Sequence, residues 1–139
     1  MNSWKMLYDD FLSKHKYIKL NEAATKEQII NVENALNCIL PDDLQELLLE
    51  INGDGWFLLS TEQIIETNLE MRQLGCFMPL DHLVFFAGNG NGDFYGYPIT
   101  QQDGAKGDSI FFWDHEYDNR IWIANSLKDI IIKYYLDEC

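Results

Sequence analysis

The first quarter of the chain has apolar residues at the spacing of amphipathic helices. One stripe, with the spacing i, i+3, i+4, i+7 and i+8, predicts a first helix whose buried side consists of Trp4, Leu7, Tyr8, Phe11 and Leu12. Thr25 and Gln28 have the spacing of a capping box, which predicts the start of a second helix. The buried face of that helix is expected to hold Ile29, Val32 and Leu36.

A third helix is predicted by the segment LPDDLQELLLEING, residues 40–53. Pro41 suits the first helical position, and Asp42 and Asp43 beside it suit the positive end of the helix dipole. Asn52 and Gly53 accept a left-handed backbone and are expected to end this helix. Its inward face is expected to hold Leu44, Leu47, Leu48 and Ile51.

The hydrophobic pattern changes after residue 55. Residues 56–59 are predicted to form a short strand, and Ser60 with Gln63 predicts a capped helix that runs to about residue 73. Five further short segments are rich in aromatic and β-branched residues, as strands are: 77–80, 83–87, 94–100, 109–113 and 120–124. No long helical connection separates them, so they are expected to pair antiparallel. Ser126 and Asp129 cap a predicted last helix, whose apolar stripe is Leu127, Ile130, Ile131 and Tyr134.

This order of elements predicts an α+β fold, in which N-terminal helices and one C-terminal helix pack on an antiparallel sheet. Residues 1–139 are expected to form a single domain, because the chain contains no repeat, low-complexity tract or linker. No apolar run reaches the roughly 18 residues that span a bilayer. The first ten residues carry acids where a signal peptide needs an apolar core, so a cytoplasmic location is expected. The three cysteines have no CxxC spacing, so Cys38 and Cys76 are expected to be buried thiols.

The charge of the chain narrows its possible partners. There are 23 acidic and 10 basic residues, and the net charge is −13. Residues 27–71 contain ten acids and no lysine, arginine or histidine. Such a surface repels phosphate backbones and attracts cations, so direct nucleic-acid binding is disfavoured and a basic protein partner is favoured. The alternative is that the acidity only keeps the protein soluble.

The segment GNGNGDFYGYP, residues 88–98, raises the question of a ligand-binding loop. A phosphate loop needs a helix after its glycines, but a strand is predicted there. Asn89, Asn91 and Asp93 alternate like the first ligands of a calcium loop, yet Phe94 stands where that loop requires glycine. The segment is therefore interpreted as a tight turn between strands, which displays Asn91, Asp93 and Tyr95 at a rim of the sheet.

Two other groups of residues are candidates for a site. Asp114, His115 and Glu116 could act with Asp93 as ligands in a metal-dependent hydrolase, or they could form only a polar turn between strands. No nucleophile elbow or other catalytic set is present, so neither enzyme activity nor a cofactor or bound metal is expected. The second group is Trp56 and Trp113, which stand beside Asp54 and Asp114. Aromatic anchors flanked by carboxylates suit an interface with a basic partner, although burial in the core remains an alternative.

The order of these motifs resembles the SUKH superfamily over about residues 20–136. The resemblance rests on the cap and helix after Ala24, on LPDDLQELLLEING, on FAGNGNGDFY (86–95), on IFFWDHE (110–116) and on the SLKD segment of the last helix. Gly53-Asp54-Gly55 departs from the Gly-Gly that is frequent in that family. The superfamily includes bacterial immunity proteins and yeast regulators of cell-wall synthesis. The resemblance implies a curved sheet whose concave side binds a protein partner.

The expected function is therefore that of an immunity protein, which neutralises a cognate toxin, most readily a basic nuclease domain. A regulatory scaffold is the first alternative and a metal-dependent hydrolase the lesser one. A monomer or weak homodimer is expected, with no membrane contact. The predicted partner-binding residues are Asp54, Trp56, Asn91, Asp93, Tyr95, Trp113, Asp114, His115 and Glu116.

Overall fold

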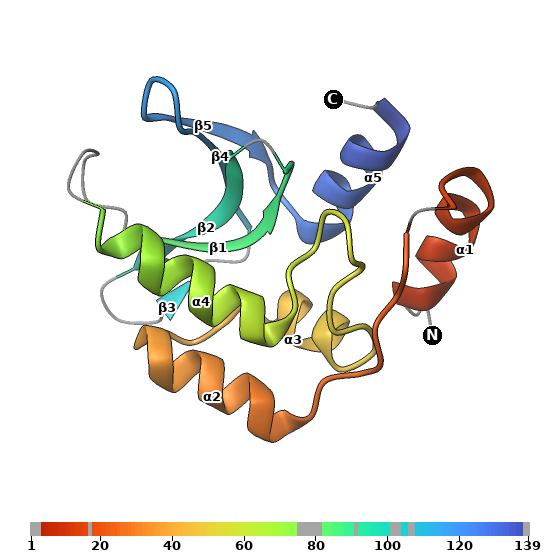
Figure 1. The fold of residues 1–139 in the computed structure, drawn as a ribbon, viewed down its shortest axis with the longest axis horizontal. Helices are drawn as coiled ribbons and strands as arrows, with labels where there is room; N and C mark the ends of the chain where they lie inside the picture. The colour runs from red at the N-terminus through yellow and green to blue at the C-terminus, as the bar shows by residue number, and fades with distance from the viewer. Residues whose placement is uncertain are drawn as a thin grey trace.

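Five helices and one antiparallel sheet make up the part of the chain that the structure describes (Figure 1). The structure is a computed structural model and describes residues 4–16, 18–74, 82–90, 92–100, 104–105 and 108–137. In chain order the elements are α1 (Trp4–Lys14), α2 (Lys26–Leu36), α3 (Asp42–Leu48), α4 (Thr61–Arg72), β1 (Leu83–Gly88), β2 (Phe94–Thr100), β3 (Gly104–Ala105), β4 (Ile110–Asp114), β5 (Asn119–Ala124) and α5 (Leu127–Asp137). This order confirms the predicted α+β class.

The strands are arranged in the order β1–β2–β4–β5, and β3 pairs with β2 outside this row. Every pairing among these strands is antiparallel, as the sequence predicts. Phe94 lies opposite Trp113, which lies opposite Arg120, so one register extends across three strands. The sheet is curved; α4 lies along β1, and α2 packs against α4 (Figure 1). The predicted curved sheet with helices packed on it is confirmed.

The helix starts agree with the capping signals in the sequence. At α2 the Thr25 hydroxyl accepts from the Gln28 N–H at 3.1 Å, and the Gln28 side chain accepts from the Thr25 N–H at 2.9 Å. Ser60 and Gln63 make the same reciprocal pair at α4. Such pairs satisfy backbone donors that the first turn of a helix leaves without partners.

The third helix is shorter than predicted. α3 ends at Leu48, and Leu49 caps it in a right-handed conformation, so Asn52 and Gly53 do not form its end. The Ile51 N–H donates to the Leu47 carbonyl in a turn that continues past the helix. Gly53 adopts its left-handed conformation (φ 90°) in the loop that follows. Pro41 is the N-cap, one position before the predicted one.

The strand predicted at residues 56–59 is wrong, because the segment forms only a single bridge, between Leu58 and Ala87. The backbone N–H groups of residues 56, 57 and 58 all donate to the Asp54 carboxylate. Donors that bind one carboxylate oxygen are not available to a strand ladder, so the chain curls into a loop. The strand predicted at residues 77–80 lies outside the described residues.

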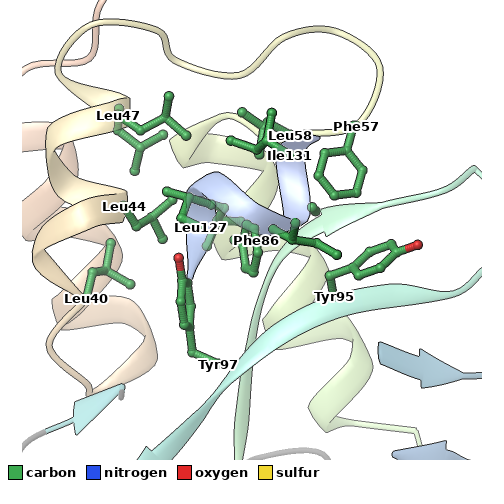
Figure 2. Close-up of a cluster of buried hydrophobic side chains, with 14 of the residues drawn as sticks. Leu40, Leu44, Leu47, Phe57, Leu58, Phe86, Tyr95, Tyr97, Leu127 and Ile131 are labelled. Carbon is green, nitrogen blue, oxygen red and sulfur yellow. The ribbon is translucent and has the colours of Figure 1, made fainter. Parts of the chain in front are cut away.

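The main core lies between the helices and one face of the sheet. Figure 2 shows leucines of the α3 region, side chains of the loop before α4 and residues of β1, β2 and α5 meeting in it. Tyr97 belongs to this core, and its hydroxyl has no hydrogen-bond partner among the described residues. A smaller cluster of Leu83, Phe85 and Trp113 lies outside the main core. Cys38 is buried, as predicted, and Cys76 lies outside the described residues.

Candidate functional site

A fully buried carboxylate, Asp54, organises the loop between α3 and α4. One of its oxygens accepts the backbone N–H groups of Trp56, Phe57 and Leu58 at 2.9, 2.7 and 2.8 Å. The other oxygen accepts the hydroxyl of Tyr8 at 2.8 Å and that of Tyr135 at 2.5 Å. We refer to this arrangement as the Asp54 cluster. It joins α1 and α5 to the loop, because Tyr8 lies 46 positions before Asp54 and Tyr135 lies 81 positions after it.

The Asp54 cluster compensates for the cost of burying a charge. An ionised carboxylate away from water is tolerated when donors surround it, and here five donors do so. Burial and the nearby charge of Asp54 raise the pKa of Tyr8 well above its ordinary value, so this phenol remains a donor at neutral pH. The result is a rigid loop, because its backbone conformation is fixed by a side chain that cannot leave the core.

This rigid loop presents Trp56 on the surface. The Trp56 side chain is 52 % exposed, while Phe57 and Leu58 beside it are buried. Phe57 stacks on Tyr134 at a centroid distance of 4.0 Å and meets Tyr95 edge-on at 5.1 Å. An exposed indole on a fixed backbone loses little conformational freedom when a partner covers it.

Hydrogen bonds connect the Trp56 loop to two further loops. The Gly88 N–H donates to the Phe57 carbonyl, which joins residues 53–59 to the turn between β1 and β2. Asp93 in that turn accepts the backbone N–H of His115 at 3.0 Å, and its same oxygen lies 2.6 Å from His115 Nδ1. His115 begins the turn between β4 and β5. The loop 53–59, the described turn residues 88–90 and 92–94, and the loop 114–118 therefore lie together, and we name them the three-loop site.

The pair of Asp93 and His115 is the charged part of the three-loop site. The hydrogen bond to Asp93 raises the pKa of His115. Partial burial acts to raise the pKa of Asp93, but hydrogen bonds from His115 and Asn89 outweigh it, and the pKa of Asp93 is lowered overall. The imidazole ring also packs on Gly92 (φ 96°), where a Cβ atom would lie 3.1 Å from the ring. The pair thus favours its ion-paired form and fixes the glycine-rich turn.

Three ligand atoms at the three-loop site lie close enough together to be considered for a metal ion. They belong to Asp93, Asp114 and His115 and lie within 4.8 Å of one another. Glu116 is not part of this group, although the sequence suggested it. The His115 nitrogen and the Asp93 oxygen bind each other, and an Asp114 oxygen accepts the Glu116 N–H at 2.9 Å. The donor set therefore fits a structural turn better than a metal centre.

The predicted site residues divide by exposure. Trp56 and Glu116 are exposed, and Asp93, Asp114 and His115 are partly exposed, so the structure brings these five to the surface of the three-loop site. Asn91 lies outside the described residues.

Three of the predicted contact residues, Asp54, Tyr95 and Trp113, are buried in the isolated chain, although the sequence placed them at the partner surface. Asp54 binds the loop backbone, Tyr95 packs against Phe57, and Trp113 is fully covered. The Trp113 indole N–H donates to Asp118 at 2.7 Å, which satisfies its one polar atom in the interior. These side chains support the exposed residues of the site from within.

An exposed apolar group that the sequence did not predict lies at the other end of the β4–β5 turn. Ile121 and Trp122 of β5 are 54 % and 52 % exposed, and Tyr117 in the turn is 75 % exposed. The sequence carries a signal for Ile121 and Trp122: residues 121–123 are apolar at three consecutive positions. This pattern does not suit a strand with one buried and one solvent-exposed face.

No helix within the described ranges is both long and apolar enough to cross a bilayer. Fold and site together define an α+β domain with an exposed tryptophan on a loop held by a buried carboxylate, and with acidic residues at the adjoining turns. A family model matches residues 23–133, and the chain belongs to the SMI1 / KNR4 family (SUKH-1). No curated protein matches the chain. Membership of this family indicates a protein that binds other proteins, in immunity or in regulation.

Proposed function

We propose that this protein is a cytoplasmic immunity protein, which binds a toxin through the three-loop site and thereby neutralises it. The observation that carries the proposal is the combination of SUKH-1 membership with a net charge of −13. A toxin with a nuclease domain suits this charge, because nucleases hold phosphate in positively charged clefts.

Acidic side chains would serve mainly to accelerate capture. Electrostatic attraction raises association rates by about 10- to 1000-fold at low salt. Glu116 is exposed at the three-loop site, and Asp93 and Asp114 are partly exposed there. A positively charged cleft would be drawn to this end of the molecule.

Trp56 would serve to slow release of the toxin. Large aromatic side chains that become fully covered dominate the energies of protein interfaces. The Asp54 cluster holds the backbone N–H of Trp56 in place before a partner arrives, so little ordering cost opposes binding. In this way the buried Asp54 fixes the backbone of the exposed Trp56, which follows it by two positions.

Co-expression tests the proposal. The chain is expressed with each of a panel of toxic nuclease domains in bacterial cells, and survival is measured. Rescue from at least one basic domain is expected, and a stable complex should be recovered by gel filtration. Trp56→Ala should weaken rescue, whereas Ile30→Ala, at an equally exposed position on α2, should not. Failure of the folded wild-type protein to bind or neutralise any domain of the panel would overturn the proposal.

A regulatory scaffold is the second candidate, because the SUKH superfamily, to which the matched family belongs, includes regulators as well as immunity proteins. This candidate requires several cellular partners of modest affinity and no neutralised toxin. Affinity purification from cells, followed by mass spectrometry, separates the two: one dominant basic partner supports the immunity function, and many partners support the scaffold.

A further inference from the structure

The two edge strands of the sheet differ in the contacts that their outer sides make. β1 is one edge strand, and its outer backbone groups are occupied. The Asn68 side chain of α4 accepts the Phe85 N–H at 2.7 Å and donates to the Phe85 carbonyl at 2.9 Å. Further along, the Leu59 N–H donates to the Phe86 carbonyl, and the Gly88 N–H donates to the Phe57 carbonyl. This edge is covered along most of its length, as proteins usually arrange to prevent unwanted pairing.

β5 is the other edge strand of the sheet that the structure describes. Within the described ranges, β4 is its only strand neighbour. Lys133 of α5 donates to the Ile123 carbonyl near the end of β5. The stretch before that point, residues 119–122, is solvent-exposed except for the partly covered Arg120.

The exposed stretch of β5 also carries large apolar side chains. Ile121 and Trp122 alternate across the strand, so one lies on each face of the sheet at its edge, and each is more than half exposed. Tyr117 adds a third exposed ring in the preceding turn. Exposed apolar groups beside an open strand edge form the surface to which an added strand binds. The backbone then supplies hydrogen bonds, and alternate side chains supply contacts.

Charge decides between the possible occupants of this edge. A second copy of the chain would bring another net charge of −13, which opposes self-pairing through long-range repulsion. The hairpin that ends in β5 contains Asp114 and Glu116, and its Arg120 is already bound to Asp118 at 2.7 Å. A positively charged segment is therefore the complementary partner.

We infer that β5 is a docking edge, to which the protein partner adds an extended segment rich in lysine or arginine as a further strand. The inference rests on the proposed function in that the partner is a basic protein, and it extends the binding surface from the three-loop site to the adjacent strand. Figure 1 shows that β5 and its turn lie at the rim of the sheet, away from α2 and α4.

The experiment uses the full chain and a ten-residue peptide of alternating lysine and valine, with the glutamate–valine peptide as its charge-reversed match. Hydrogen exchange, read residue by residue by NMR, is measured with each peptide at low salt. Slowed exchange is expected within residues 119–123 with the lysine peptide and nowhere with the glutamate peptide. Protection confined to the helices, or no protection at all, would refute strand addition at β5.

A pair of variants separates edge pairing from simple charge attraction. Ile121→Lys places a charge on the docking edge, whereas Ile30→Lys makes the same change of charge on α2 at nearly the same exposure. The first should weaken peptide binding by about ten-fold or more, and the second by about two-fold at most. Circular dichroism checks that both fold. Equal weakening would overturn the inference, and so would a concentration-dependent dimer that is abolished by Ile121→Lys.

The two proposals can fail separately. If Ile121→Lys leaves toxin neutralisation at the wild-type level, the β5 inference fails and the immunity function stands. If the wild-type chain neutralises no toxin yet binds the lysine peptide along β5, the immunity function fails and the docking edge stands.

Discussion

Replacing Asp54 by alanine would test whether this one buried carboxylate holds three parts of the chain together. The substitution removes the acceptor of five hydrogen bonds. The Trp56 N–H lies next to an exposed side chain and can reach water. The N–H groups of Phe57 and Leu58 and the hydroxyls of Tyr8 and Tyr135 belong to buried residues and lose the Asp54 oxygens that they bind.

The size of the effect follows from those four donors. A buried donor without a partner costs about 1–3 kcal/mol, and partial relaxation places each near the lower limit. Asp54→Ala should therefore reduce the free energy of unfolding by about 4 kcal/mol, a large share of the 5–15 kcal/mol typical of domains. Asp54→Asn should cost less, about 1–2 kcal/mol, because its amide oxygen still accepts the backbone donors.

Three tyrosine variants provide matched controls, because all three rings are buried. Tyr8→Phe and Tyr135→Phe each delete one hydrogen bond to a charged group and should cost about 1.5–3 kcal/mol. Tyr97→Phe deletes a buried hydroxyl that has no partner among the described residues. Its stability should stay at the wild-type level or rise by up to about 1 kcal/mol.

Urea unfolding, followed by circular dichroism at pH 7, measures all of these changes through the midpoint and the slope. The slope should stay constant, so that differences in midpoint report stability alone. Two results would refute the reasoning: a midpoint for Asp54→Ala that corresponds to less than about 1 kcal/mol of destabilisation, or an equal loss for Tyr97→Phe and Tyr8→Phe.

Three further predictions concern the turns and the sheet edge. Gly53→Ala should destabilise by more than Gly90→Ala in urea unfolding, since both have positive φ but only the Gly53 Cβ would lie within 2.9 Å of backbone; equal losses would contradict this. The Asp93–His115 ion pair should make the free energy of unfolding depend on pH. The pKa of His115 is raised in the folded state, so its contribution to stability is full below pH 6.5 and is lost as the pH rises through the folded-state pKa. The pKa of Asp93 is lowered in the folded state, so its contribution is present above pH 3.8 and is lost as the pH falls through the folded-state pKa. His115→Gln should therefore lower the urea midpoint more at pH 5 than at pH 8.5, and a pH-independent difference would refute the pairing. Asn68→Leu should cost about 2–4 kcal/mol and speed hydrogen exchange at residue 85, because both backbone groups of that residue lose their partner; unchanged exchange there would argue against edge capping.

Much of the fold could be predicted from local signals. Thr25 and Ser60 start their helices because a hydroxyl and a glutamine three residues later satisfy each other's backbone groups, and this depends on adjacent sequence alone. β2 occupies the predicted range, residues 94–100. The strand predicted at residues 56–59 is wrong because the apolar residues there match a strand, while the competing interaction comes from the Asp54 side chain, whose burial the sequence does not show.

The burial of the candidate-site residues could not be predicted, for a related reason. The turns that carry Asp93 and His115 could be located, and their hydrogen bond confirms that the two motifs meet. Exposure could not be read from residue type, since Trp56 and Trp113 both stand beside an acid and only one is on the surface. Burial depends on which face of which strand another element covers.

The sequence by itself determined the class of fold, the helix starts, most of the strands and the strongly negative charge. Each of these depends on neighbouring residues or on composition. Only the tertiary structure decided that Asp54 is an internal acceptor for Tyr8 and Tyr135, and that α4 and the loop before it cover the β1 edge, while β4 is the one described strand beside β5. Contacts between residues 46 or 81 positions apart leave no periodic trace in a sequence, because they arise when separately formed elements pack together.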